Sequence, residues 1–108
     1  SVFKAREWWS TQCGDSGAEE LGPGCMAVGN LDNAEPPSAK IAVGCFSGVL
    51  RVYRPSQREF RAEDLMLEQQ LGAPILQVEV GVFSSHSAKE VQLAILHPKR
   101  LCVYGVQA

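Results

Sequence analysis

The chain has 108 residues, of which 45% are hydrophobic and 20% are charged, and its formal net charge is −2. These values suit a globular domain or part of one, and they exclude the strongly basic field of a nucleic-acid-binding protein. No run approaches the roughly 18–20 apolar residues of a membrane helix. We therefore expect a chain that is soluble or held at a membrane through partners, with neither nucleic acid nor a small-molecule substrate among its ligands.

The cysteines lack the spacing of a metal or redox site. They are Cys13, Cys25, Cys45 and Cys102, and no pair has the CxxC spacing. The last three lie within apolar, strand-like runs, where a free thiol packs as a small hydrophobe. We predict free thiols, no metal and no cofactor.

The chain begins with a lead-in segment and a loop rich in Gly, Glu and Ser, which together span residues 1–23. Apolar runs bounded by turn residues then predict strands at 24–31, 40–46, 49–54, 65–71, 75–83, 91–96 and 101–106. Ser47-Gly48 predicts a two-residue hairpin turn between the second and third strands. Residues 62–71 are good helix formers, although Leu65 and Leu67 also fit a half-buried strand.

An internal repeat is the most informative feature of the sequence. Val28-Gly29-Asn30-Leu31 matches Val80-Gly81-Val82-Phe83 at an offset of 52 residues, and two further matches follow in the same order. These are Ile41-Ala42-Val43 with Leu93-Ala94-Ile95 at 52, and Val52-Tyr53 with Val103-Tyr104 at 51. A period of about 40–50 residues with four short strands is typical of a propeller blade. The repeat therefore favours a strand over a helix in residues 62–71.

We predict an all-β fold that forms the first blades of an N-terminal β-propeller. Blade 1 spans residues 24–71, and residues 72–108 form a partial blade 2 that ends before its fourth strand. The run from Ile41 to Phe46 is apolar on both faces, and such a strand needs cover on both sides. The alternative is a seven-strand β-sandwich, which needs about 100 residues and similar alternation but does not require the repeat.

An ordered series of short segments also carries a family resemblance. The segments are Phe3–Thr11, Asn30–Asn33, Lys40–Gly44, Ala62–Leu65, Pro74–Gly81, Leu93–His97 and Leu101–Tyr104. Together they cover most of the chain, and they resemble the start of the parathyroid hormone-responsive B1 family, whose members are subunits of the Bardet–Biedl coat complex, the BBSome. Four loops depart from the family pattern: Cys13–Pro23, Ala34–Ala39, Pro55–Arg61 and Ser84–Glu90.

The resemblance implies an N-terminal β-propeller in a longer, non-enzymatic scaffold subunit. Such a subunit acts through contacts with other Bardet–Biedl subunits in the trafficking of membrane proteins to and from the cilium. The resemblance also implies indirect membrane recruitment through an Arf-like GTPase, and a location in the cytoplasm, the cilium and ciliary membrane, and the basal body or centrosome region. The alternative function is that of an independent small β-sandwich binding domain.

No residue pattern predicts catalysis. Gly14-Asp15-Ser16-Gly17 resembles the nucleophile segment of trypsin-like proteases, but no His precedes Ser16, as that family requires. His86 and His97 lie in predicted loops without a ligand at metal spacing, so we expect them to be solvated. The same expectation holds for the adjacent carboxylates of Glu19-Glu20 and Glu63-Asp64, which lie in polar stretches.

Trp8 and Trp9 are the strongest candidates for protein interaction, with Phe3 nearby. Two adjacent indoles carry a large apolar area, and Trp is enriched in binding hot spots. The alternative is that one or both fold back onto the chain's own sheet. Arg51 and Arg54 are further candidates, because they begin a loose basic cluster that continues at positions 58 and 61. Acidic residues interrupt this cluster, so a solvated mixed surface is the alternative to an interaction rim.

Overall fold

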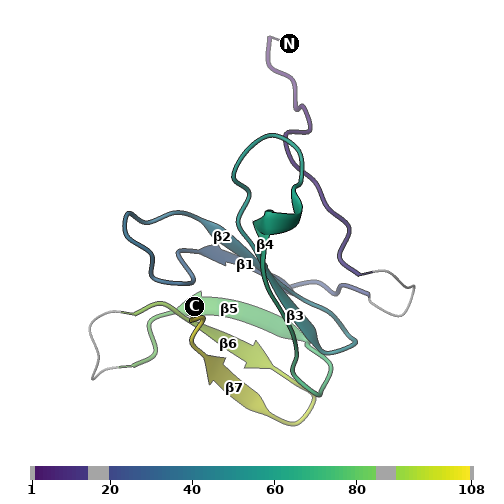
Figure 1. The fold of residues 1–108 in the computed structure, drawn as a ribbon. Coiled ribbons are helices and arrows are strands. Elements are labelled where there is room, and N and C mark those ends of the chain that lie inside the picture. Colours follow the sequence, from purple (N-terminus) through teal and green to yellow (C-terminus); the bar gives the residue numbers. More distant parts are fainter. Residues whose placement is uncertain (1, 15–19, 85–89, 108) are drawn as a thin grey trace.

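The computed structural model describes residues 2–14, 20–84 and 90–107, which form two antiparallel sheets (Figure 1). Sheet A contains, in chain order, β1 (Met26–Gly29), β2 (Lys40–Gly44), β3 (Val49–Tyr53) and β4 (Leu65–Gln70). Sheet B contains β5 (Gln77–Gly81), β6 (Gln92–Leu96) and β7 (Leu101–Tyr104). Besides these strands, the described residues include a single turn of 3₁₀ helix, η1 (Ala62–Asp64). The all-β prediction is therefore confirmed, and no described helix is long and apolar enough to cross a membrane.

The two sheets bury a common apolar core. Its fully packed members come from both sheets and from the segments that enter them: Leu31, Ala42, Leu50, Val52, Ile75, Val78, Leu93 and Ile95. Strands β1 and β5 lie side by side where the sheets meet, as Figure 1 shows. Gly29 permits this approach, because a Cβ there would lie only 3.2 Å from Val80 Cγ1. Burial of each large apolar side chain contributes about 1.5–3 kcal/mol, so this core is what holds sheet to sheet.

The sequence repeat reappears in the strand register. Counterparts pair in the same way across each sheet: Val28, Ile41 and Tyr53 in sheet A, and Val80, Leu93 and Tyr104 in sheet B. The row in sheet B packs into the shared core, whereas the row in sheet A lies on the face that points away from sheet B. The two sheets thus stack head to tail, with unlike faces in contact, and this is a heterologous arrangement.

The ambiguous segment at residues 62–71 forms a strand after one helical turn. Its first three residues make η1, and β4 then pairs with β3 from Val49↔Gln70 to Tyr53↔Leu65. Pairing with a neighbouring strand outweighs a helix propensity that is worth only tenths of a kcal/mol per residue. The preference for a strand that the repeat supplied is confirmed.

The turn between β2 and β3 differs from the predicted two-residue Ser47-Gly48 turn. Gly48 N donates to Cys45 O (3.0 Å) and Cys45 N donates to Val49 O (3.0 Å), so the loop has three residues. Gly48 has φ 92°, the left-handed conformation that closes such loops. A Cβ on Gly48 would also lie 2.8 Å from Ala73 O, because the link between β4 and β5 packs directly on this turn.

A buried ion pair fixes the loop between β1 and β2. Lys40 Nζ lies 2.6 Å from Asp32 Oδ1 and donates to Asn30 Oδ1 at 2.7 Å, and the lysine is almost fully buried. The hydrogen bond from Lys40 lowers the pKa of Asp32 below its ordinary value, against the opposing effect of burial. A buried lysine is tolerated in this position because its ammonium group pairs with the Asp32 carboxylate and donates to the Asn30 side-chain oxygen.

The connections gather at two ends of the stacked sheets. The turn end holds the β2–β3 turn, the β4–β5 link and the β6–β7 turn, at residues 45–48, 71–76 and 97–100, and it lies at the lower right of Figure 1. The loop end holds the longer connections at residues 30–39 and 54–64. Two hydrogen bonds tie loops of the two sheets together at that end: Asn33 Nδ2 donates to Val91 O (3.2 Å), and Val91 N donates to Asn33 Oδ1 (2.8 Å).

Candidate functional site

The two adjacent indoles occupy different environments. Trp9 folds back onto sheet A, where its ring meets those of Tyr53 and Phe60 edge to face, each with a centroid separation of 5.7 Å. Its Nε1 donates to Asp64 Oδ2 at 2.9 Å. Trp8 remains 52% exposed. The structure therefore assigns the folded-back arrangement to Trp9, and Trp8 stays about half exposed.

Asp64 is the anchor for Trp9, and it is only 1% exposed. Besides the indole, Ser56 Oγ donates to Oδ1 (2.7 Å) and Arg61 N donates to Oδ2 (3.0 Å). The hydrogen bonds from Trp9 and Ser56 hold the pKa of Asp64 below its ordinary value of 3.8, although burial acts in the opposite direction. The expectation of a solvated Asp64 is wrong, because a carboxylate with three donors can be buried while ionised.

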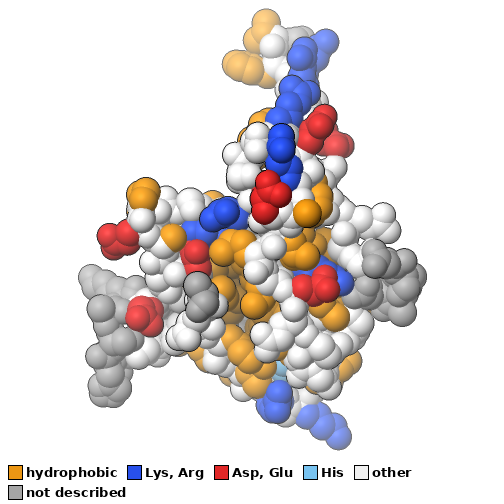
Figure 2. All heavy atoms as spheres, viewed as in Figure 1, with side chains coloured by type: hydrophobic (Ala, Val, Ile, Leu, Met, Phe, Trp, Pro, Cys, Tyr) orange, Lys and Arg blue, Asp and Glu red, His pale blue; other side chains and the backbone are white. Residues whose placement is uncertain are grey.

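The segment before Trp8 projects away from the sheets. Phe3 is 87% exposed, and Val2 is exposed as well. Figure 2 shows apolar side chains at the tip of this projection and basic side chains along it. Phe60, which the sequence did not single out, supplies the second ring against Trp9. The predicted aromatic site is thus divided into a docked half around Trp9 and an exposed half that contains Phe3 and Trp8.

The predicted arginine pair is separated in the structure. Arg51 is buried on β3, where its Nε lies 2.8 Å from Glu68 Oε2 and its Nη1 donates to Cys45 Sγ at 3.3 Å. Arg54 follows the end of β3 and is exposed. Arg51 therefore joins β3 to β4, and Arg54 is the member of the pair that faces solvent.

The outer face of sheet A carries an apolar cavity of about 480 Å³. Its walls come from the lead-in segment and from β1, β2 and β3, and they include Trp9, Leu21, Cys25, Met26, Ile41, Val43 and Tyr53. Cys13 is also part of the wall and accepts a long hydrogen bond from Tyr53 Oη, at 3.7 Å to its Sγ. The cavity offers shape and apolar area, and its wall contains no charged residue.

Possible metal ligands do not form a group of three or more in the part of the chain that the structure covers. Among residues 2–14, 20–84 and 90–107, no group of His, Cys, Asp and Glu is arranged to hold a metal ion. Ser16, Glu19 and His86 lie outside the described residues. The four cysteines are free thiols, as predicted.

His97 contradicts the expectation of a solvated loop histidine, because it is only 1% exposed. The β6–β7 turn folds inward, which places His97 Nδ1 2.9 Å from Pro74 O. A carbonyl only accepts, so Nδ1 carries the proton and ties the β6–β7 turn to the β4–β5 link. This contact joins residues 23 positions apart, a distance at which no local sequence pattern could have indicated it.

Comparison with known proteins decides the family. The sequence profile of the family described as PTHB1 N-terminal matches residues 1–108, which is the whole chain. The chain belongs to the PTHB1 N-terminal family. It is 48% identical over 110 residues to Protein PTHB1 of Xenopus laevis, 47% to that of Homo sapiens and 46% to that of Mus musculus. Each alignment covers 98% of this chain and 12–13% of the relative, so the chain spans about an eighth of the PTHB1 length.

Membership in the PTHB1 family confirms the part of the resemblance that concerns the family itself. The resemblance rested on the ordered segments that include Phe3–Thr11 and Pro74–Gly81. In the structure, the first of these segments contains the docked Trp9. The second contains the last residues of the β4–β5 link and the whole of β5. The segments on which the resemblance rested therefore include one that anchors the N-terminal segment to sheet A and one that lies at the junction between the sheets.

Proposed function

We propose that this chain is the opening part of a β-propeller in a non-enzymatic scaffold subunit of the BBSome. In this role it acts through protein–protein contacts in the trafficking of membrane proteins to and from the cilium. The observation that carries the proposal is the match of the PTHB1 N-terminal family along the whole chain. The proposed domain bounds come from the sequence repeat: a lead-in segment at 1–23, blade 1 at 24–71 and a partial blade 2 at 72–108.

The stacking of the two sheets supports a propeller over a sandwich. The core-facing residues Leu50 and Val52 of sheet A have counterparts in Leu101 and Val103 of sheet B, at an offset of 51. Leu50 and Val52 are buried, whereas Leu101 is 67% exposed, on the face of sheet B that points away from sheet A. In sheet A these positions are buried by the next sheet and in sheet B their counterparts are open, and this arrangement fits a series of blades in which each sheet covers the one before it. A closed series has about 4–8 blades and no open apolar face.

The proposed partners are other Bardet–Biedl subunits, with indirect membrane recruitment through an Arf-like GTPase. The proposed location is the cytoplasm, the cilium and ciliary membrane, and the basal body or centrosome region. We propose no catalytic residue and no cofactor. Within the described residues, the side chains that suit contact with a partner are the exposed aromatic groups of Phe3 and Trp8 and the exposed cation of Arg54.

Affinity capture from ciliated cells tests the proposal. The bait is the intact protein, and the variants are Trp8→Ala and, as a matched control, Phe83→Ala, which removes another half-exposed aromatic side chain. Quantitative mass spectrometry should recover a stoichiometric set of Bardet–Biedl subunits with the wild type and the control. Selective loss of one subunit with Trp8→Ala places a contact at Trp8. A bait that recovers no such subunit rejects the coat assignment and favours the independent binding domain.

A further inference from the structure

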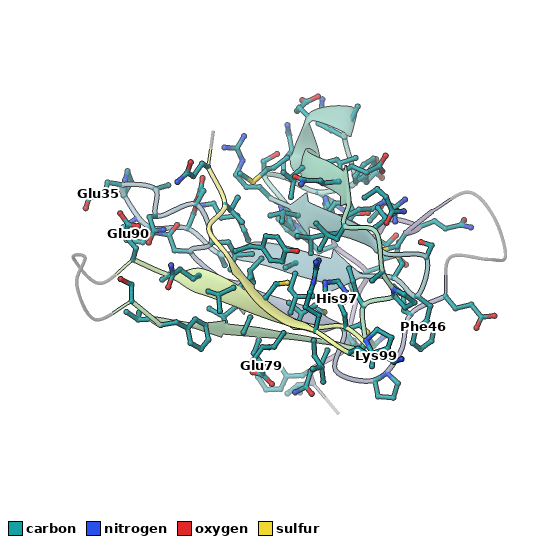
Figure 3. The ribbon with its side chains drawn as sticks, turned by 90° about the horizontal axis from the view of Figure 1, so that it is seen from below. Glu35, Phe46, Glu79, Glu90, His97 and Lys99 are labelled. Atoms are coloured by element: carbon teal, nitrogen blue, oxygen red, sulfur yellow. The ribbon has the colours of Figure 1, made fainter. Side chains whose placement is uncertain are left out.

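A groove of about 570 Å³ lies at the turn end, between the β4–β5 link and the β6–β7 turn. We call it the turn groove, and its walls are Leu71, Gly72, Ala73, Pro74, His97, Pro98, Lys99 and Arg100. Figure 3 looks onto this end and shows His97 within the fold, with Lys99 at the edge. None of the groove's wall residues belongs to the lead-in segment, whose Trp9 packs at the loop end through Asp64.

The walls of the turn groove are held in place before any partner binds. The His97–Pro74 hydrogen bond joins its two sides, and His97 N donates to Arg100 O at 2.8 Å within one of them. Leu71 N donates to Gly48 O at 2.8 Å, which fixes the other side to the β2–β3 turn. Pro74 on one side of the groove and Pro98 on the other restrict the backbone further. A preformed groove loses little conformational entropy when it is occupied.

The charge of the turn groove is opposite in sign to that of the chain. The chain has 12 acidic and 10 basic residues, yet none of the eight wall residues is acidic. Lys99 and Arg100 are exposed, and neither forms an ion pair with a carboxylate in the described parts of the chain. Figure 2 shows basic side chains at the lower tip of the molecule beside a histidine. Two cations without a paired carboxylate, beside the apolar residues of the turn groove, suit a ligand that combines carboxylates with apolar side chains.

We propose that the turn groove binds an acidic, extended peptide segment of a partner protein. Its carboxylates pair with Lys99 and Arg100, and its apolar side chains lie against Leu71, Pro74 and Pro98. A nucleic acid would need a broad basic field, and an anionic membrane would need a larger basic cluster. The groove has only two cations, in a concave site, so neither of these ligands suits it. This proposal rests on the proposed role in protein docking, but it does not depend on which complex contains the chain.

Peptide selection on the intact protein tests the turn groove. A phage library of random dodecapeptides is panned against the wild type, against Lys99→Glu/Arg100→Glu and against a control matched in charge and residue type away from the turn end, Lys4→Glu/Arg58→Glu. The wild type and the control should enrich peptides that contain Asp and Glu beside apolar residues. A synthetic copy of one enriched peptide, followed by fluorescence anisotropy, should bind the groove variant at least about tenfold more weakly and should weaken as salt is raised.

Several outcomes overturn the proposal. Enriched peptides without acidic residues reject the ligand chemistry, and equal binding to the groove variant rejects the site. Binding of phosphatidylserine vesicles that depends on Lys99 and Arg100, without any selected peptide, replaces the peptide with a membrane. If no peptide binds the groove while affinity capture still recovers the coat subunits, the turn groove is rejected and the proposed function stands. Conversely, if the protein binds acidic peptides through the groove but recovers no coat subunit, the turn groove stands and the proposed function is rejected.

Discussion

The junction between the sheets offers a sharp test, because one glycine has no room for a side chain. Gly44, at the end of β2, lies against Ile75, which is fully buried. A Cβ on Gly44 would overlap Ile75 Cγ2 and would lie 3.0 Å from both Ile75 Cβ and Cδ1. Gly44→Ala should therefore destabilise the junction by about 1–3 kcal/mol, the usual cost of an overpacked core.

The companion change, Ile75→Ala, removes Cγ1, Cγ2 and Cδ1 and leaves a cavity, with an expected cost of about 2–5 kcal/mol. In the double variant, the new methyl group at position 44 meets none of the removed atoms and fills part of the space they leave. The double variant should therefore be more stable than the sum of the two single effects implies, by about 1–3 kcal/mol.

Hydrogen exchange on the intact protein measures this cycle locally, through the opening free energies of amides in β2 and β5. The amide of Ile75 is a direct reporter, because its N donates to Cys45 O at 3.2 Å. Gly105→Ala is the control, since a Cβ there meets no atom within 4 Å, and its effect should stay within about 0.5 kcal/mol. Additive single effects, within about 0.5 kcal/mol, would refute the proposed clash.

Two further predictions concern buried charges. Lys40→Met should leave Asp32 without its cation and raise hydrogen exchange in the β1–β2 loop, at a cost of about 3 kcal/mol, and unchanged exchange would contradict the role of the pair. Because donors lower the pKa of Asp64 in the folded chain, its stabilising effect is present above the ordinary value of 3.8 and is lost as the pH falls through the lower, folded-state value. Acrylamide quenching of Trp9 in a Trp8→Phe background should show protection at pH 7 that is lost below pH 3.8, whereas Asp64→Asn should be more quenched at pH 7 and insensitive to acid.

The strand pattern was predictable because it depends on information that repeats along the chain. Alternation and turn residues placed each strand within a few positions, and the 52-residue repeat decided residues 62–71 where local propensity favoured a helix. The β2–β3 turn was wrong in detail, since Ser47-Gly48 fits a two-residue loop and a three-residue loop alike. The hydrogen bonds from Gly48 N to Cys45 O and from Cys45 N to Val49 O distinguish the two loops, and they exist only in the folded chain.

The candidate site was harder to predict, because its contacts join distant positions. Trp9 and Asp64 are 55 residues apart, and nothing local distinguishes Asp64 from the neighbouring Glu63. For the same reason the sequence could not separate Trp8 from Trp9, although it stated the alternative that one indole folds back. The buried His97 shows the same limit, since its partner is a backbone carbonyl, which every residue possesses.

The open face of sheet B provides a last prediction, which separates a propeller from a sandwich. Leu101 is 67% exposed in the described chain, while its counterpart Leu50 is buried between the sheets. On an isolated surface, Leu101→Glu should change stability by no more than about 0.5 kcal/mol. Beneath a further blade of the intact protein, the same change buries a charge in an apolar interface and costs several kcal/mol. Exchange of the β7 amides in the intact protein measures the difference. Leu21→Glu, at another exposed leucine, is the control. If the β7 amides exchange slowly in the wild type and in the control but fast in Leu101→Glu, a further sheet covers sheet B. If exchange is unchanged in both variants, sheet B is the outer layer of a two-sheet sandwich.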